Sequence, residues 1–340
     1  GKLGVYGHSM GGKLTVLTAG ADARVKAAAP SCGGLSDRYS EDPLFRATLG
    51  DDVYLRHIAC PVMFLSPSND FHGRLPDLQQ AVTEILTPEW RVTCSPHHNH
   101  QDTAAYEVAT QLWFDQQLKG TFAFPRTPET ELSLKTKDGV PVFSVRPDVS
   151  RRILAVDIFY TQQGPRAAQQ VGGKDDREAT IARFWHHAVA TRKGDAWTAA
   201  LPVLDTDRPL WAYANVRYAL EQPVTGAGYY YRTYTTKEFN LSSLTAMVSP
   251  AELKAARVKA TRQPTALIES FTGHWEKEWF TYKPEEWGRR THKLHEPEWQ
   301  APPASKLALE IRAAQPNILV VGIDEHAAEV ALAGDGQWQS

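Results

Sequence analysis

The sequence predicts an α/β fold, a parallel sheet with flanking helices, followed by β-rich domains. Residues 1–122 alternate short apolar runs with segments of helical composition, which is typical of a parallel sheet covered by helices. Beyond residue 122 the apolar runs are β-branched and aromatic, and turn residues separate them. At 340 residues the chain is long enough for two or three domains.

The first part contains four predicted strands and two clear helices. The strands are the apolar runs at residues 2–7, 23–32, 60–67 and 89–96. The helices are predicted at residues 9–20 and 102–120. Asp102 is expected to cap the start of the last helix, and Gly120 is expected to end it.

The later part is expected to contain two β-rich domains. Residues 123–235 predict a β-sandwich of immunoglobulin-like type. Its strand-like runs lie at residues 152–161, 196–204, 210–220 and 229–236. Residues 236–340 predict a second β-rich domain of jelly-roll type, whose C-terminal end is expected to be incomplete. In it we expect one helix at 249–260 and two strands joined by a turn at 313–317.

The composition excludes several classes of protein. Hydrophobic residues make up 42% and charged residues 22% of the chain, and no apolar run reaches the roughly 18 residues of a membrane span. The net charge is −2 without a Lys/Arg cluster, so neither a membrane nor a nucleic acid is an expected partner. The three cysteines, Cys32, Cys60 and Cys94, show no Cys-x-x-Cys spacing and are expected to be small buried hydrophobes.

Residues 7–11 form the most informative motif of the sequence. Gly7-His8-Ser9-Met10-Gly11 fits G-x-S-x-G, and it lies between a predicted strand and a predicted helix, as this motif requires. The sharp turn exposes the Ser9 hydroxyl, and Gly7 and Gly11 leave room for it. The backbone N–H of Met10 is expected to point to where an oxyanion would form. The alternative is a glycine-rich turn without chemistry.

A serine hydroxyl needs a base, and the base needs a third group that holds its tautomer. With this motif the acid and then the histidine follow the serine in the sequence. Asp70 lies in a turn directly after the predicted strand at 60–67, so it is the expected acid. An Asx turn in this segment is the alternative explanation of Asp70.

The base is expected among three histidines that follow the fourth strand. They are His97, His98 and His100, and we expect His100, next to the last helix, to be the base, with His98 as the alternative. Together with His72 these residues also raise the possibility of a metal site. Zinc sites favour ligands at regular spacing, with carboxylates that bond to those ligands, and this segment does not repeat that pattern, so no metal ligand is assigned.

Three segments carry a resemblance to the α/β-hydrolase superfamily. They are residues 6–12 (YGHSMGG), 61–70 (PVMFLSPSND) and 95–120 (SPHHNHQDTAAYEVATQLWFDQQLKG). The chain resembles the dienelactone-hydrolase-like and acetylxylan-esterase-like serine hydrolases over residues 1–122. That resemblance implies Ser9 as nucleophile, His100 as base, Asp70 as acid and no cofactor. It also favours a secreted or periplasmic location.

The resemblance predicts an N-terminally truncated chain. A whole sheet of this superfamily has further strands before the Ser9 turn, and one of them leads to the second oxyanion donor. We therefore expect a fragment that starts at the fifth strand and is poorly active by itself.

The predicted function is that of a serine-dependent hydrolase of carboxylic esters. By resemblance, the substrate would be a small-molecule or carbohydrate ester, such as an acyl group on a polysaccharide. One alternative is a serine peptidase of prolyl-oligopeptidase type, which uses the same triad. The other is a carbohydrate-binding module with an inactive hydrolase remnant.

Aromatic residues of the later part suggest either sugar stacking or packing. Trp275, Trp279, Tyr282 and Trp287 lie close together in the sequence and could form a carbohydrate-binding surface, although core and interdomain packing is the more common role of large rings. Other residues of this part are expected to be structural, namely Trp185, Trp197, Trp211, His186 and His187.

Overall fold

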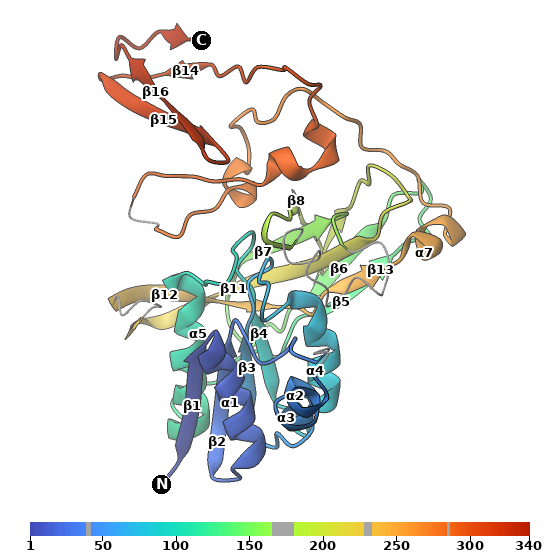
Figure 1. The fold of residues 1–340 in the computed structure, drawn as a ribbon, viewed down its shortest axis with the longest axis vertical. Helices are drawn as coiled ribbons and strands as arrows, with labels where there is room; N and C mark the ends of the chain where they lie inside the picture. The colour runs from blue at the N-terminus through green and yellow to red at the C-terminus, as the bar shows by residue number, and fades with distance from the viewer. Residues whose placement is uncertain (39–41, 165–179, 228–232, 284–285) are drawn as a thin grey trace. The chain divides into compact units, whose positions relative to one another are not determined.

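The computed structural model begins with a four-stranded parallel sheet of order β1-β2-β3-β4 (Figure 1). Its strands are β1 (Leu3–His8), β2 (Val25–Ser31), β3 (Val62–Leu65) and β4 (Trp90–Thr93). They lie in the four apolar runs that predicted them, which confirms the parallel α/β arrangement of the first part. The helices are α1 (Met10–Ala21), α2 (Pro43–Thr48), α3 (Asp51–Leu55), α4 (Leu78–Glu84) and α5 (Ala104–Phe114).

The structure describes residues 1–38, 42–164, 180–227, 233–283 and 286–340. Contacts divide the chain into two units, residues 1–300 and residues 301–340. No helix in these ranges is both long enough and apolar enough to cross a membrane.

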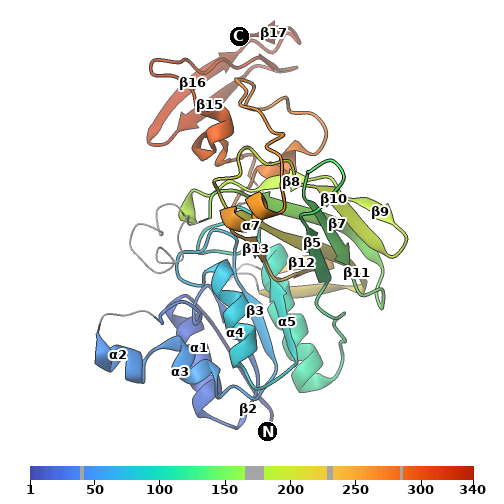
Figure 2. The same cartoon turned by 90° about the vertical axis from the view of Figure 1, so that its right-hand side faces the viewer.

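Alternation along the parallel strands gives the sheet two buried faces. On β2, Ala28 packs with α1, α3 and α4, whereas Ala27 and Ala29 pack on the face that α5 covers. On β3, Phe64 and Met63 divide between the two faces in the same way. Helices therefore cover both faces of the sheet, as parallel sheets require (Figure 2).

Two antiparallel sheets follow. The first has the order β5-β6-β10-β9, and the second has the order β12-β11-β7-β8, with β13 paired to β11. Their strands are β5 (Glu129–Ser133), β6 (Val142–Arg146), β7 (Ile153–Thr161), β8 (His186–Ala188), β9 (Thr191–Lys193), β10 (Ala196–Ala200), β11 (Leu210–Ala227), β12 (Thr233–Ser242) and β13 (Ala246–Val248). β12 runs across the expected boundary at residues 235 and 236 and pairs with β11. The domain boundaries and the immunoglobulin-like topology stay predictions.

One hydrophobic core joins the parallel sheet to the antiparallel sheets. Leu112 and Trp113 of α5 belong to the same buried cluster as Phe143 of β6, Ile158 of β7 and Val216 of β11. Trp185 and Trp211 are buried in the cluster on the other face of the parallel sheet, and Trp197 packs against the joint core. The expected structural role of these three tryptophans agrees with their positions.

The described residues between 249 and 300 contain little regular structure. Helix α7 (Pro250–Ala255) starts with a capping box in which Ser249 and Glu252 bond to each other's backbone N–H. This helix is shorter than the predicted 249–260. The remaining elements are the 3₁₀ turns η5 (Trp275–Glu278), η6 (Lys293–His295) and η7 (Pro297–Trp299); an earlier one, η1 (Leu75–Asp77), precedes α4.

Residues 236–340, predicted as a jelly roll, divide instead between the sheet of β11, which β12 and β13 join, and two separate two-stranded sheets in residues 301–340. The strands are β14 (Ile311–Arg312) with β17 (Trp338–Gln339), and β15 (Asn317–Ile323) with β16 (His326–Leu332). The strands on the two sides of the predicted turn at 313–317, β14 and β15, do not pair with each other. β14 pairs with β17, and β15 pairs with β16, with the turn between them at Asp324 and Glu325. A jelly roll needs eight strands around a core, and side chains such as Ile318 and Val320 are largely exposed here.

The end of α5 follows the prediction and its start does not. Gly120 takes the left-handed conformation after a π-helical turn at η2 (Asp115–Lys119). The N-cap is Thr103, because the Asp102 side chain accepts a hydrogen bond from Ser95 Oγ at 2.5 Å. Asp102 is therefore a buried partner of the β4–α5 loop and not a cap.

The joint core predicts cooperative unfolding of residues 1–300. Phe143→Ala should lower the free energy of unfolding by about 3–5 kcal/mol, because the fully buried ring leaves a cavity. Denaturant unfolding followed by tryptophan fluorescence and by circular dichroism should give the same shifted midpoint. Val149→Ala, at a side chain that is 71% exposed, is the control. A variant that loses only the antiparallel sheets, in a separate transition, would contradict the joint core.

Candidate active site

Ser9 occupies the sharp turn between β1 and α1. Its backbone has φ 60° and ψ −120°, and its N–H donates to the carbonyl of Ser31 on β2 at 2.9 Å. A Cβ at Gly7 would lie 2.3 Å from the carbonyl oxygen of Gly11, so the turn requires glycine at position 7. The second tight contact is at Gly12, whose Cβ would meet Ser31 O at 2.4 Å. At Gly11 itself a Cβ would meet no atom outside the helix, which corrects the expectation that Gly11 is needed for space.

Asp70 lies in the turn after β3 and is fully buried. Its Oδ1 accepts a hydrogen bond from the backbone N–H of His72 at 2.8 Å, which is an Asx turn. The same oxygen lies 3.0 Å from Nδ1 of His100. The two explanations of Asp70 are therefore compatible, because one carboxylate oxygen makes both contacts.

His100 bridges the other two predicted residues. Its Nε2 lies 2.7 Å from Ser9 Oγ, while its Nδ1 faces Asp70. The ring of Phe71 packs on the imidazole with centroids 4.4 Å apart. The structure thus brings Ser9, His100 and Asp70 into one hydrogen-bonded row, with His100 partly accessible to solvent.

His97 and His98 point away from Ser9. His98 has Nδ1 at 2.7 Å from Pro96 O and Nε2 at 3.1 Å from Thr281 O. Since a neutral imidazole has one N–H, it donates to only one of these carbonyls at a time. His97 Nε2 lies 3.0 Å from Lys277 O. Of the two histidines considered as the base, His100 therefore contacts Ser9, whereas both ring nitrogens of His98 face backbone carbonyls.

Hydrogen bonds join two loops of the site. The acid loop is residues 66–74, after β3, and the histidine loop is residues 94–103, between β4 and α5. The N–H of Asn69 donates to His98 O at 3.0 Å, and the N–H of His97 donates to Ser68 Oγ at 2.7 Å. The Asn69 amide group also donates to Arg183 O at 2.7 Å and accepts from Trp185 Nε1 at 2.9 Å. These contacts fix the loop that carries Asp70 relative to the one that carries His100.

Tyr282 braces the residue before His100. The N–H of Asn99 donates to the Tyr282 hydroxyl at 2.9 Å, and that hydroxyl donates to Asn99 O at 3.1 Å. We call residues 277–282 the brace segment, because Lys277 and Thr281 of this segment face the rings of His97 and His98. Sequence reasoning missed this role of Tyr282, since nothing local links positions that are so far apart in the chain.

The acid of this row is held in its charged form. Burial raises the pKa of the Asp70 carboxyl, but hydrogen bonds from the His100 ring and from the His72 backbone outweigh burial and leave the pKa below its usual value. Burial and the neighbouring Asp70 raise the pKa of the Cys32 thiol, so Cys32 is a neutral neighbour. A charged carboxylate beside Nδ1 favours the tautomer whose Nε2 is free to accept the Ser9 proton.

Two further carboxyl groups are buried behind the site. Burial raises the pKa of Glu107 to about 7, and Tyr6 donates a hydrogen bond to it at 2.9 Å. Burial and the charge of Glu107 also raise the pKa of Asp102. A carboxyl with a raised pKa carries less negative charge near neutral pH, which leaves Asp70 as the main anion beside His100.

The histidines of the loop do not converge on one point. Within the described ranges, one group of three potential metal ligands lies within 4.8 Å, namely Cys32, Asp70 and His100. Two of its members already bond to each other in the Ser9 row. His72 pairs with Asp37 at 3.4 Å, and the unassigned metal alternative of the sequence therefore gains no support from this geometry.

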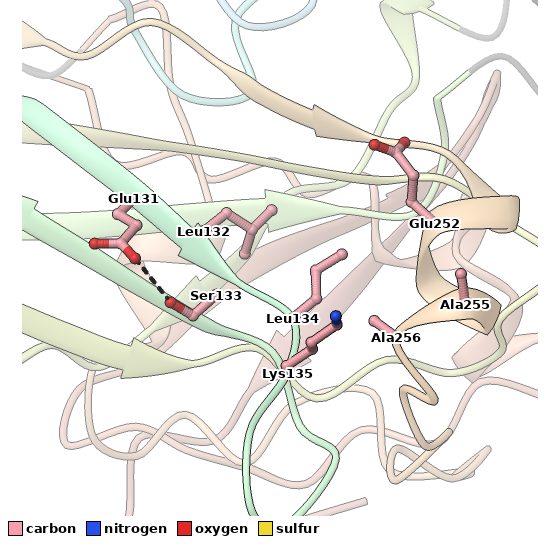
Figure 3. A pocket seen from close by; sticks show the side chains of 8 residues that line it. All are labelled: Glu131, Leu132, Ser133, Leu134, Lys135, Glu252, Ala255 and Ala256. Atoms are coloured by element: carbon pink, nitrogen blue, oxygen red, sulfur yellow. Dashed lines mark hydrogen bonds between the residues drawn. The ribbon is translucent and has the colours of Figure 1, made fainter.

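A shallow hollow of about 450 Å³ lies apart from Ser9, between β5 and α7 (Figure 3). Leu132 and Leu134 supply its apolar wall, and Glu131 bonds to Ser133 across its edge. Neither the Ser9 row nor a histidine lines it. It offers no serine paired with a histidine and is not the candidate active site.

His97 should make stability depend on pH. Burial lowers its pKa to about 3, whereas an unfolded histidine has a pKa near 6.5, so between these values only the unfolded chain binds this proton. Above pH 6.5 the protonation of His97 does not lower the free energy of unfolding. Below that pH it lowers the free energy of unfolding by about 1.4 kcal/mol per pH unit toward pH 3. Glu296 opposes this trend, because burial raises its pKa to about 7.

Comparison with His97→Phe isolates this contribution. The variant keeps a ring next to Phe184 and Phe280, so the fold should be retained. Urea unfolding at pH 7, 6, 5 and 4.5 should show that the parent loses stability relative to the variant as the pH falls. Parallel pH profiles for the two proteins would contradict the assignment.

Comparisons with known proteins found structural similarity only. No protein-family model and no curated protein matches the sequence. An acetyl xylan esterase from Paenibacillus sp. R4 is 18% identical, with a TM-score of 0.29, over 34% of this chain and 45% of that one. Acetyl Xylan Esterase 1 from Thermoanaerobacterium sp. JW/SL YS485 is 16% identical, with a TM-score of 0.29, over 33% and 44%.

The acetyl ester-xyloside bifunctional hydrolase from Caldicellulosiruptor lactoaceticus is 15% identical, with a TM-score of 0.25, over 35% of this chain and 57% of that one. The chain spans less than half the length of the two acetyl xylan esterases. At such TM-scores the similarity determines neither fold nor chemistry. The partial α/β fold of this chain is assigned from its own parallel sheet and helices.

Proposed function

We propose that this protein is a serine hydrolase that cleaves carboxylic esters through an acyl-enzyme. The observation that carries the proposal is the row in which His100 lies 2.7 Å from Ser9 Oγ and 3.0 Å from Asp70 Oδ1. A nucleophile, a base and an orienting acid at these distances form the arrangement that activates a hydroxyl.

The proposed reaction has two halves. His100 Nε2 takes the proton of Ser9 as its Oγ attacks the ester carbonyl, and Asp70 stabilises the imidazolium. The tetrahedral intermediate then collapses, the C–O bond of the ester breaks, and His100 gives the proton to the leaving alcohol. Water, activated in turn by His100, hydrolyses the acyl group from Ser9 and restores the enzyme.

Met10 is the proposed oxyanion donor. It is the first residue of α1, and the first amides of a helix have no acceptor within that helix. The positive end of the α1 dipole adds to the stabilisation of a negative oxygen beside Ser9. A second donor is not assigned.

The proposed substrate is an acylated carbohydrate, and this part rests on the resemblance of residues 1–122. An aryl acetate, an acetylated xylan and a peptide p-nitroanilide tested side by side separate an esterase from a peptidase. Cleavage of the peptide alone would favour the prolyl-oligopeptidase type.

Covalent labelling tests the nucleophile directly. A fluorophosphonate should label the protein at Ser9 with one equivalent, because the probe reacts with hydroxyls that have an adjacent base. Ser9→Ala should abolish the label, and Ser133→Ala, on β5, should retain it. A folded parent that stays unlabelled, or a labelled Ser9→Ala variant, would overturn the proposal.

The acid is tested by Asp70→Asn. The amide keeps the shape of the side chain but favours the wrong imidazole tautomer, so kcat for an aryl acetate should fall by about 10⁴-fold. Asp52→Asn, at a carboxylate on α3 that pairs with Arg56, is the matched control and should keep the activity of the parent. Equal activity of the parent and the Asp70 variant would show that Asp70 does not act on His100.

Tyr282→Phe tests the brace segment. Loss of the hydroxyl leaves the backbone of Asn99 without both hydrogen bonds, which should lower kcat by about tenfold while KM changes less than about twofold. Tyr54→Phe removes another hydroxyl bonded to a backbone carbonyl, that of Thr48, and should leave kcat unchanged. A change in KM alone would contradict a positioning role for Tyr282.

A further inference from the structure

A second cavity, of about 350 Å³, lies behind the histidine loop. Its walls come from residues 96–98, the start of α5, strands β7, β11 and β12, residues 276–281 and Arg289. Ser9, Asp70 and His100 do not line it. Its volume falls at the lower end of the range of small-molecule sites. The cavity thus lies within the 1–300 unit, on the histidine loop and the brace segment but apart from the Ser9 row.

Ion pairs neutralise much of the charge on the walls. Lys277 Nζ lies 2.7 Å from Asp157 Oδ2, and the other oxygen of Asp157 lies 3.1 Å from His187 Nε2. Arg217 pairs with Glu238 at 3.2 Å. Such pairs expose polar edges to a ligand without a strong preference for either sign of charge.

Other polar groups of the lining have hydrogen-bonding capacity to spare. Asn240 is 95% buried, its amide nitrogen donates to Thr93, Asn215 and Ser242, and its Oδ1 accepts no hydrogen bond from a described residue. Among the described residues the Tyr106 hydroxyl also has no hydrogen-bond partner, and the Arg289 guanidinium bonds to the carbonyl of Gly288 alone. These groups can therefore accept from or donate to a ligand without breaking a bond within the protein.

Aromatic rings form the remaining wall. Trp279 and Phe280 line the cavity, and a hydrogen bond from Trp279 Nε1 to Glu269 at 3.1 Å fixes the indole. Phe271 and Trp275 pack against the same indole. The cavity therefore presents apolar ring faces next to amide, hydroxyl and guanidinium groups.

We propose that this cavity binds one neutral glycosyl unit. A pyranose has hydroxyls that both donate and accept, which suits Asn240, Tyr106 and Arg289, and it has an apolar C–H face that suits Trp279. The paired charges of the walls select against a strongly anionic or cationic ligand. This inference goes beyond the proposed function and does not depend on Ser9.

Binding is tested with the full chain by isothermal titration calorimetry. The probes are xylotriose, cellotriose and mannotriose, with trigalacturonate as the anionic counterpart. At least one neutral trisaccharide should bind with a Kd of about 1 mM or tighter. Ser9→Ala should bind it equally well, which separates this site from the proposed esterase.

Two tryptophan variants place the ligand. Trp279→Ala should weaken binding at least tenfold, whereas Trp287→Ala, at an 82% exposed ring that does not line the cavity, should leave the Kd unchanged. Asn240→Asp keeps the volume of the side chain and puts a charge at Oδ1, so it should also weaken binding.

Three outcomes would overturn the inference. The first is no neutral saccharide bound at 10 mM, a concentration about tenfold above the expected Kd. The second is tighter binding of trigalacturonate than of every neutral probe. The third is a loss of affinity in Trp287→Ala as large as in Trp279→Ala, which would place the sugar on the exposed surface.

Discussion

The hydrogen bond between His100 Nδ1 and Asp70 is the contact on which the candidate site depends. A carboxylate without solvent exposure is costly unless donors surround it, and the donors to Asp70 include this imidazole, the backbone N–H of His72 and the Cys32 thiol. The bond therefore stabilises the acid loop and sets the direction of Nε2 in one step. Two further hydrogen bonds hold the acid loop and the histidine loop together. They join the Asn69 N–H to His98 O and the His97 N–H to Ser68 Oγ.

The antiparallel sheets take part in this arrangement. Two residues just before β8 bond to the side chain of Asn69, which is next to Asp70. The carbonyl of Arg183 accepts from the Asn69 amide, and the indole N–H of Trp185 donates to the oxygen of that amide. Directly after β4, the backbone N–H of Cys94 donates to Ser242 Oγ, and the backbone carbonyl of Cys94 accepts from the amide of Asn215. The β-rich part of residues 1–300 thus supports both loops of the site, in addition to sharing a core with α5.

Local patterns predicted the parts of the structure that local physics determines. The parallel strands follow from apolar runs, and the order of Ser9, Asp70 and His100 follows from strand ends that meet at one edge of a sheet. Errors arose where distant residues decide. Asp102 resembles an N-cap in sequence, yet Ser95 binds its side chain, and Tyr282 carries no local signal of its contact with Asn99. The jelly roll predicted for residues 236–340 is wrong because β12 and β13 pair with β11, and because the apolar side chains of β15 and β16 stay largely exposed instead of enclosing a core.

Positive φ angles occur at four non-glycine residues around the site: φ is 60° at Ser9, 53° at Cys32, 62° at His97 and 45° at His100. Each costs of the order of 1 kcal/mol in an L-amino acid, and replacement by glycine would remove that cost. At Ser9 and His100 glycine would also remove the reacting oxygen or nitrogen. A glycine at Ser9 or His100 would therefore raise thermal stability only at the expense of the proposed catalytic activity. Substitutions that make this protein more stable and keep its site have to lie elsewhere in the chain.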